Sequence, residues 1–205
     1  MSHDLHRRAL LLSWFTVGYN IVEGIVSIAA GAAAGSIALI GFGMDSFIES
    51  LSGSVMIWRF SGRGSRTDDE ERQIEEIAQK LVGATFFIFA TYVFYESAAK
   101  LLRREMPDPS LVGIVIASLS IVIMPVLYVL KYRTGKAIGS RGLVADSKET
   151  LACVYLSVSL LAGLGLNYFF RLWWADPVVG LLVVYFLVRE GIETFGGEEG
   201  DEDDD

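Results

Sequence analysis

Two pairs of residues carry metal-binding side chains within otherwise apolar stretches. Asp45 and Glu49 are four residues apart in the second apolar stretch, and Glu149 and Cys153 have the same spacing in the fifth. In a helix this spacing places both side chains of a pair on one face, one turn apart. A charged group at the centre of a membrane helix costs about 2.5–3.5 kcal/mol on insertion scales, so each pair requires a function or a partner.

Three carboxylates and one thiolate predict a binding site for a divalent cation. Carboxylate oxygen and thiolate sulfur both bind Zn²⁺, and a tetrahedral site needs four such donors. The thiolate favours zinc, cadmium and similar borderline metals over magnesium or calcium. Because these ligands lose protons when they bind a metal, metal release and proton uptake are coupled. The sequence leaves open whether Cys153 binds the metal or only lines the cavity.

The two pairs are predicted to lie at similar depth. Along a helix, Arg59 lies about 15 Å beyond Glu49, and Cys153 lies about 18 Å beyond Arg141. Both basic residues are expected on the cytoplasmic side, so the pairs lie near the middle of a hydrocarbon core of roughly 30 Å. A single buried carboxylate could instead pair with Lys148 or serve helix packing. Two pairs matched in depth favour a function.

Other acidic and amide side chains in these stretches have both functional and structural interpretations. Asn20 and Glu23 could line an ion path, or they could form hydrogen bonds between helices. Asp146 could line an access route to the metal, or it could cap the start of its helix. Asp176, which precedes Pro177, is predicted to cap the last helix.

The elements that position these residues are predicted to be six transmembrane helices. The chain has 205 residues, of which 52% are hydrophobic, and its mean hydropathy is +0.45. Windows of about 19 residues give the predicted spans 9–33, 37–59, 81–101, 111–130, 143–170 and 177–192. The sequence therefore predicts an all-α, multi-pass membrane protein with one domain, 1–195, located in the cell membrane or the inner membrane of a bacterium.

Charged residues outside the predicted spans set the orientation. Basic residues concentrate in the breaks 61–80 and 131–141, the second of which begins with Lys131. The positive-inside rule therefore predicts that both termini are cytoplasmic. Residues 196–205 are predicted to be an acidic, disordered tail that carries most of the formal net charge of −8. The remainder is close to neutral, which argues against a nucleic-acid binder.

The chain contains stretches that resemble signatures of the cation diffusion facilitator family. The second-helix signature of that family is close to SGSLALLADAxHxLSD, and its first two metal ligands align with Asp45 and Glu49. The matching stretch here is AAGSIALIGFGMDSFIES. The first and sixth helices of the family resemble YNIVEGIVSIAAG and WWADPVVGLLVVYFLVREGIE. The third and fourth predicted helices match the family in character alone.

The fifth-helix signature of the family, close to ADAxHxxxDVLxSLxVLxGL, resembles LVADSKETLACVYLSVSLLAGL. This match places Glu149 at the family's His position and Cys153 at its Asp position, so the metal preference is open. The C-terminus also departs from the family pattern. Residues 194–205 follow the sixth helix where relatives have a ferredoxin-like cytoplasmic domain, so we expect a short form without that domain.

The resemblance implies a transporter that exports Zn²⁺ from the cytosol, usually as a proton antiporter and usually as a homodimer. Cd²⁺, Co²⁺, Fe²⁺ and Mn²⁺ are alternative cargo, and no resident cofactor is expected. The expected partners are the lipid bilayer, the metal ion and protons. The sequence contains no nucleophile–base arrangement and no phosphate loop, so nothing in it indicates an enzyme. The alternatives are a metal-binding membrane sensor or accessory subunit that does not transport, and a purely structural membrane subunit.

Overall fold

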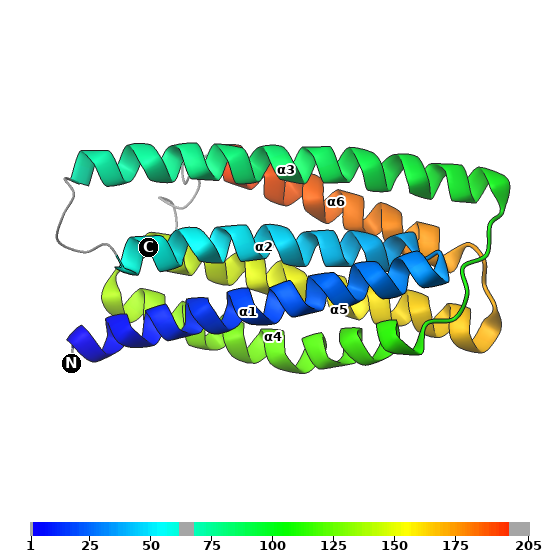
Figure 1. Cartoon of the computed structure of the whole chain (residues 1–205), viewed down its shortest axis with the longest axis horizontal. Helices are drawn as coiled ribbons and strands as arrows, with labels where there is room; N and C mark the ends of the chain where they lie inside the picture. The colour runs from blue at the N-terminus through cyan, green and yellow to red at the C-terminus, as the bar shows by residue number, and fades with distance from the viewer. Residues whose placement is uncertain (1, 62–67, 197–205) are drawn as a thin grey trace, which may run out of the picture.

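The computed structural model is a bundle of long helices in which successive helices run in opposite directions (Figure 1). It describes residues 2–61 and 68–196, and this part of the chain contains helices and no strand. The six helices are α1 (Ser2–Ala34), α2 (Ile37–Ser61), α3 (Asp68–Arg103), α4 (Leu111–Ile138), α5 (Arg141–Phe170) and α6 (Ala175–Gly196). The predicted all-α fold with six helices is confirmed. The acidic segment 197–205 lies outside the described residues.

Several helices are suited to a membrane. Within the described residues, three segments are long and apolar enough to cross a bilayer by length and composition alone, namely Asp4–Ala34, Leu111–Ile138 and Gly142–Phe170. Large apolar side chains such as Trp14, Val122 and Phe169 face outward from the bundle. Such a surface suits lipid, because soluble monomers rarely expose extended apolar surface. These features agree with the predicted multi-pass membrane protein.

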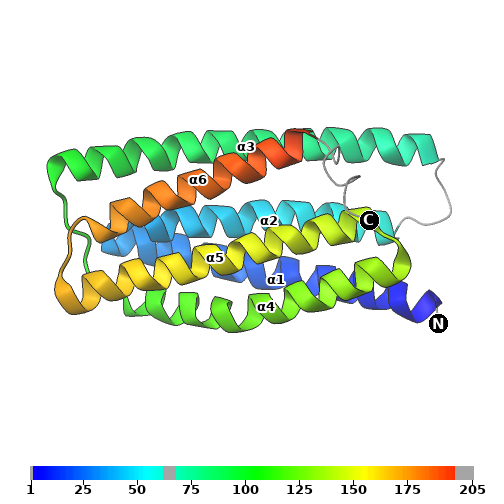
Figure 2. The same cartoon turned by 180° about the vertical axis from the view of Figure 1, so that it is seen from behind.

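Helix α2 lies at the centre of the bundle. It packs against α1, α3, α5 and α6, while α3 and α6 run together along one side, as both views show (Figures 1 and 2). Helices α1 and α2 approach closely because Gly24 and Gly43 face each other. A Cβ atom on Gly43 would lie 2.9 Å from the Gly24 carbonyl oxygen. Polar side chains on α2 can therefore face protein rather than lipid.

The turn between α1 and α2 is closed by residues that are distant in the sequence. Gly35 has a φ of 65°, in the left-handed region that favours glycine. The backbone N–H of Ile37 donates to the Asp176 carboxylate at 2.9 Å, and the Ser36 hydroxyl also donates to this carboxylate. The prediction that Asp176 caps the sixth helix is therefore wrong. Its side chain caps α2, because the beginnings of α2 and α6 lie side by side.

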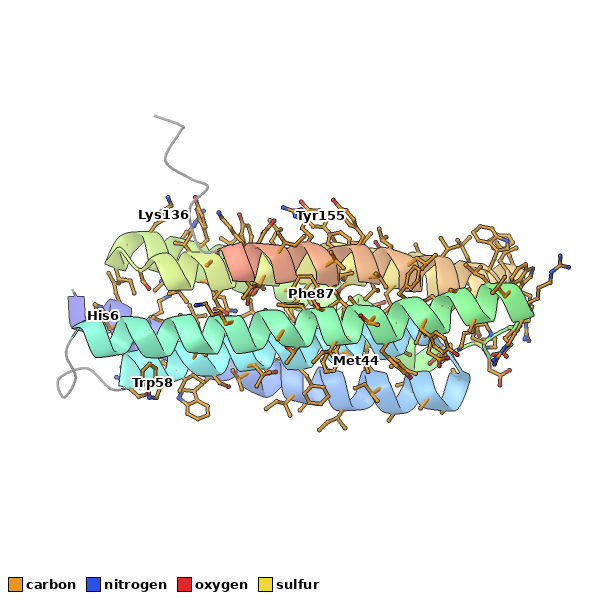
Figure 3. All side chains as sticks on the ribbon, turned by 90° about the horizontal axis from the view of Figure 1, so that it is seen from above. His6, Met44, Trp58, Phe87, Lys136 and Tyr155 are labelled. Atoms are coloured by element: carbon orange, nitrogen blue, oxygen red, sulfur yellow. The ribbon has the colours of Figure 1, made fainter. Side chains whose placement is uncertain are left out.

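The ends of α4 and α5 correct two further expectations. Helix α4 continues past Leu130 to Ile138, so Lys131 lies in a helix rather than in the predicted loop. Helix α5 is capped by Ser140, whose hydroxyl accepts from the backbone N–H of Leu143 at 3.3 Å. Asp146 therefore does not cap this helix. Side chains such as Lys136 and Tyr155 project outward from these two helices (Figure 3).

Candidate metal site

The predicted ligands on α2 lie inside the bundle. Asp45 and Glu49 are 8% and 4% exposed, one helical turn apart. On the neighbouring α5, Cys153 is buried and Glu149 is half-buried. The Cys153 thiol lies within electrostatic range of the Asp45 and Glu49 carboxyl groups, and Glu149 lies within electrostatic range of Glu49. The two predicted pairs thus lie in one polar region between α2 and α5.

Glu49 takes part in a network that joins α2, α4 and α5. Lys131 is fully buried, and its Nζ lies 2.9 Å from Asp146 Oδ2 and 3.7 Å from Glu49 Oε1. The ammonium also donates to the Thr150 hydroxyl oxygen at 2.9 Å. The Thr150 hydroxyl in turn donates to Glu49 Oε1 at 2.6 Å. One buried ammonium therefore compensates two carboxylates, and one of these is a predicted metal ligand.

Glu23 on α1 has a different set of partners. The Tyr19 hydroxyl donates to Glu23 Oε1 at 2.9 Å, and the Ser46 hydroxyl donates to Glu23 Oε2 at 3.0 Å. The bond from Ser46 connects α2 to α1. Glu23 therefore forms a hydrogen bond between helices, as the structural alternative for this residue predicts. Asn20 is fully buried, and its side chain lies close to the Glu49 carboxylate.

The comparison with known families covers nearly the whole bundle. A family model that describes the cation efflux transmembrane domain matches residues 13–195. The chain belongs to the cation efflux family. Membership confirms the resemblance seen in the sequence, and it identifies the protein as a multi-pass membrane protein of a family that transports metal cations.

Individual relatives of this cation efflux protein are distant. Transmembrane protein 163 of Xenopus laevis is 22% identical over 193 residues, which cover 94% of this chain and 68% of that protein. An uncharacterized transporter of Synechocystis sp. is 25% identical over 180 residues, which cover 86% of this chain and 58% of the relative. Magnetosome protein MamB of Paramagnetospirillum magneticum is 22% identical over 190 residues, with coverage of 89% and 63%. The chain thus spans about two thirds or less of these relatives.

The predicted metal ligands are not arranged as a closed metal cage in this structure. Across residues 2–61 and 68–196, no three His, Cys, Asp or Glu side chains converge in a metal-binding geometry. Several buried carboxylate oxygens in the region, among them Glu49 Oε2, Asp146 Oδ1 and Glu149 Oε2, form no hydrogen bond of good geometry among the described residues. Carboxylate oxygens are suitable ligands for divalent cations. The assignment of Asp45, Glu49, Glu149 and Cys153 as ligands stays a prediction.

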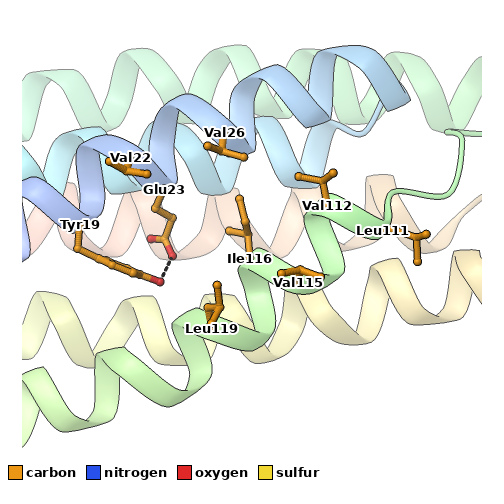
Figure 4. A pocket seen from close by; sticks show the side chains of 9 residues that line it. All are labelled: Tyr19, Val22, Glu23, Val26, Leu111, Val112, Val115, Ile116 and Leu119. Carbon is orange, nitrogen blue, oxygen red and sulfur yellow. Dashed lines mark hydrogen bonds between the residues drawn. The ribbon is translucent and has the colours of Figure 1, made fainter.

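A groove between α1 and α4 opens beside Glu23 (Figure 4). It has a volume of about 450 Å³, and its lining residues are Tyr19, Val22, Glu23, Val26, Leu111, Val112, Val115, Ile116 and Leu119. Most of these side chains are apolar, and several are exposed on the outer face of the bundle. The groove therefore suits lipid chains better than a metal ion.

Lys131 and Glu190 are charged members of the polar region that sequence reasoning missed. Glu190 on α6 is 8% exposed and lies within electrostatic range of Asp45 and Glu149. Its signal is a carboxylate inside the sixth predicted span, 177–192, but the adjacent Arg189 suggests the end of a span. Lys131 directly follows an apolar run, and hydropathy alone assigns such a lysine to a loop.

Proposed function

We propose that this protein exports Zn²⁺ from the cytosol in exchange for protons and acts as a homodimer. Asp45, Glu49, Glu149 and Cys153 bind the ion near the middle of the membrane. The observation that carries this proposal is the burial of the Asp45–Glu49 pair beside Cys153 in the interior of a cation efflux domain. Buried carboxylates in membrane helices are costly, and ion transport is the function that most often accounts for them.

Proton exchange follows from the chemistry of the proposed ligands. Carboxylates and thiolates bind Zn²⁺ in their deprotonated forms, so each metal ion that binds displaces protons. Release of the ion on the outer side leaves the ligands free to take up protons there. Asn20 and Asp146 would line the path on either side of the site, and the complete burial of Asn20 near Glu49 supports such a role. The hydrogen bonds of Glu23 to Tyr19 and Ser46 favour its role in helix packing instead.

The metal preference is assigned from the donor set. A thiolate favours Zn²⁺ and Cd²⁺ over harder cations, while the three carboxylates also suit Mn²⁺, Fe²⁺ and Co²⁺. Relatives with a His/Asp pair in the fifth helix offer a carboxylate in place of this sulfur and nitrogen in place of the Glu149 carboxylate. We therefore expect Zn²⁺ and Cd²⁺ to be transported best, with Mn²⁺ the poorest of these ions.

The test is Zn²⁺ uptake into proteoliposomes that contain a fluorescent zinc indicator, with and without a pH gradient. Wild type is compared with Asp45→Asn, and Asp108→Asn at an exposed position serves as the matched control. Gradient-dependent uptake that is lost in Asp45→Asn alone supports the proposal. Retained zinc binding without any uptake by wild type would instead indicate a metal sensor or an accessory subunit.

The oligomeric state needs a separate measurement. The mass of the protein in lipid nanodiscs or in native membranes distinguishes a monomer from a homodimer, because a chain of 22.5 kDa doubles its mass. A monomer that still transports Zn²⁺ would overturn the homodimer and leave the transport proposal intact.

A further inference from the structure

The buried lysine of α4 has no role in the proposed coordination of the metal. Lys131 is completely enclosed, and its partners belong to α2 and α5 rather than to its own helix. Burial of an ammonium within a membrane domain is costly unless a negative charge compensates it. Its position beside a proposed metal ligand therefore suggests a role that depends on its charge.

The distances from Lys131 give its two carboxylate partners different roles. Asp146 anchors the ammonium, and Glu49 is the group for which the ammonium and a metal ion would compete. Lys131 Nζ forms its shorter ion pair with Asp146, at 2.9 Å, and lies 3.7 Å from Glu49. Thr150 accepts from the ammonium and donates to Glu49, so it connects the two groups. Asp146 thus holds the ammonium in place, while the pairing with Glu49 is longer and easier to exchange.

We infer that Lys131 is a tethered counter-cation that occupies Glu49 when the metal is absent and is displaced from it when the metal binds. This inference rests on the proposed function, since it assumes that Glu49 is a metal ligand. The ammonium occupies one of the negative groups that the metal needs, so the two cations compete for Glu49. Asp146 retains the ammonium after displacement, because their ion pair does not involve the metal.

Competition of this kind tunes the affinity of a transporter. A carrier must bind its cargo and also release it, and very tight binding slows release. The ammonium returns to Glu49 as the metal leaves and so assists release. Without the ammonium we expect a lower half-saturating Zn²⁺ concentration together with a lower maximal rate of transport.

The variants Lys131→Met and Asp146→Asn have effects of opposite sign on metal binding. Lys131→Met removes the competitor, so we expect the Kd for Zn²⁺ to fall about tenfold, as for loss of a charge-assisted hydrogen bond. Asp146→Asn removes the anchor and leaves Glu49 as the carboxylate within ion-pair distance of the ammonium, with Glu149 also within electrostatic range. We therefore expect the Kd to rise about threefold to tenfold.

The double variant separates competition from a general loss of charge. If Asp146 acts by holding Lys131, then Asp146→Asn has little effect once Lys131 is methionine. If Asp146 attracts the metal by its own charge, its loss weakens binding in both backgrounds. Lys136→Met is the matched control, because Lys136 is an exposed lysine on the same helix.

The experiment is isothermal titration of the full chain in nanodiscs with Zn²⁺, for wild type and the four variants, followed by uptake assays. Tighter binding with slower maximal uptake in Lys131→Met, and a silent Lys136→Met, support the inference. Unchanged or weaker binding by Lys131→Met overturns it while the proposed function stands. If Lys131→Met does not fold, the isosteric Asp146→Asn still tests the anchor role, since unchanged or tighter binding there contradicts it. Wild type without any zinc binding overturns both proposals.

Discussion

Two buried glutamates of this bundle are compensated in different ways. Glu23 accepts hydrogen bonds from the hydroxyl groups of Tyr19 and Ser46, which are both neutral. Glu49 accepts from the Thr150 hydroxyl and also lies near the Lys131 ammonium. Neutral donors stabilise a carboxylate without supplying a charge, whereas an ammonium can be replaced by another cation. Glu23 thus joins two helices through neutral donors, whereas Glu49 lies beside the ammonium charge that a metal ion would displace under the inference above.

The largest expected effect on Zn²⁺ binding comes from removing Asp45, a proposed ligand one helical turn from Glu49. Asp45→Asn keeps the size of the side chain but removes a charged donor from the site. We expect the affinity for Zn²⁺ to fall by more than the roughly 10–100-fold that loss of an outer partner of a metal ligand causes. Isothermal titration against Asp108→Asn checks this effect. Equal affinities in the two variants would show that Asp45 is not a ligand.

Cys153→Ser is expected to change selectivity more than total binding. Serine keeps a small polar group but replaces a soft sulfur donor with a hard oxygen. We expect the preference for Cd²⁺ over Mn²⁺ to fall by about tenfold in competition assays. Ser159→Ala, at a half-buried position on the same helix, is the control. An unchanged preference would mean that Cys153 lines the cavity without binding the metal.

Glu190→Gln tests the contribution of α6 to the polar region around Asp45 and Glu49. The Glu190 carboxyl group lies within electrostatic range of Asp45, so its charge adds to the attraction for a cation. Removing that charge is expected to weaken Zn²⁺ binding by about threefold, a smaller effect than loss of a ligand. Glu193→Gln is the matched control, because Glu193 is exposed and pairs with Arg189. A comparable loss of binding in both variants would contradict a local effect.

The smallest effect on transport is expected when a hydrogen-bond donor to Glu23 is removed. Tyr19→Phe removes the hydrogen bond to Glu23 and should lower the free energy of unfolding by about 1 kcal/mol, with Zn²⁺ uptake unchanged. Thermal unfolding in detergent checks the stability, and Tyr155→Phe at an exposed position is the control. A strong loss of uptake would place Glu23 on the ion path and weaken the contrast with Glu49.

The sequence predicts the helices and the family because these depend on local patterns. Apolar runs of spanning length give the helices, and four-residue spacing gives the two pairs. The burial of Lys131 cannot be predicted in this way, since hydropathy assigns a lysine after an apolar run to a loop. Its burial depends on Asp146 and Glu49, which come from other helices. The prediction that Asp176 caps the sixth helix is wrong for the same reason, because its partner Ile37 is distant in the sequence.

The cap that Asp176 provides to α2 has a mechanical consequence. It joins the beginnings of α2 and α6 at the predicted outer end of the bundle, where Asn167 also donates to the Pro107 carbonyl at 3.0 Å. Helices that are tied at one end and tilt against each other move least at the tie and most at the far end. We expect this joint to act as a fulcrum, so that a small rotation there opens the cytoplasmic end of the bundle.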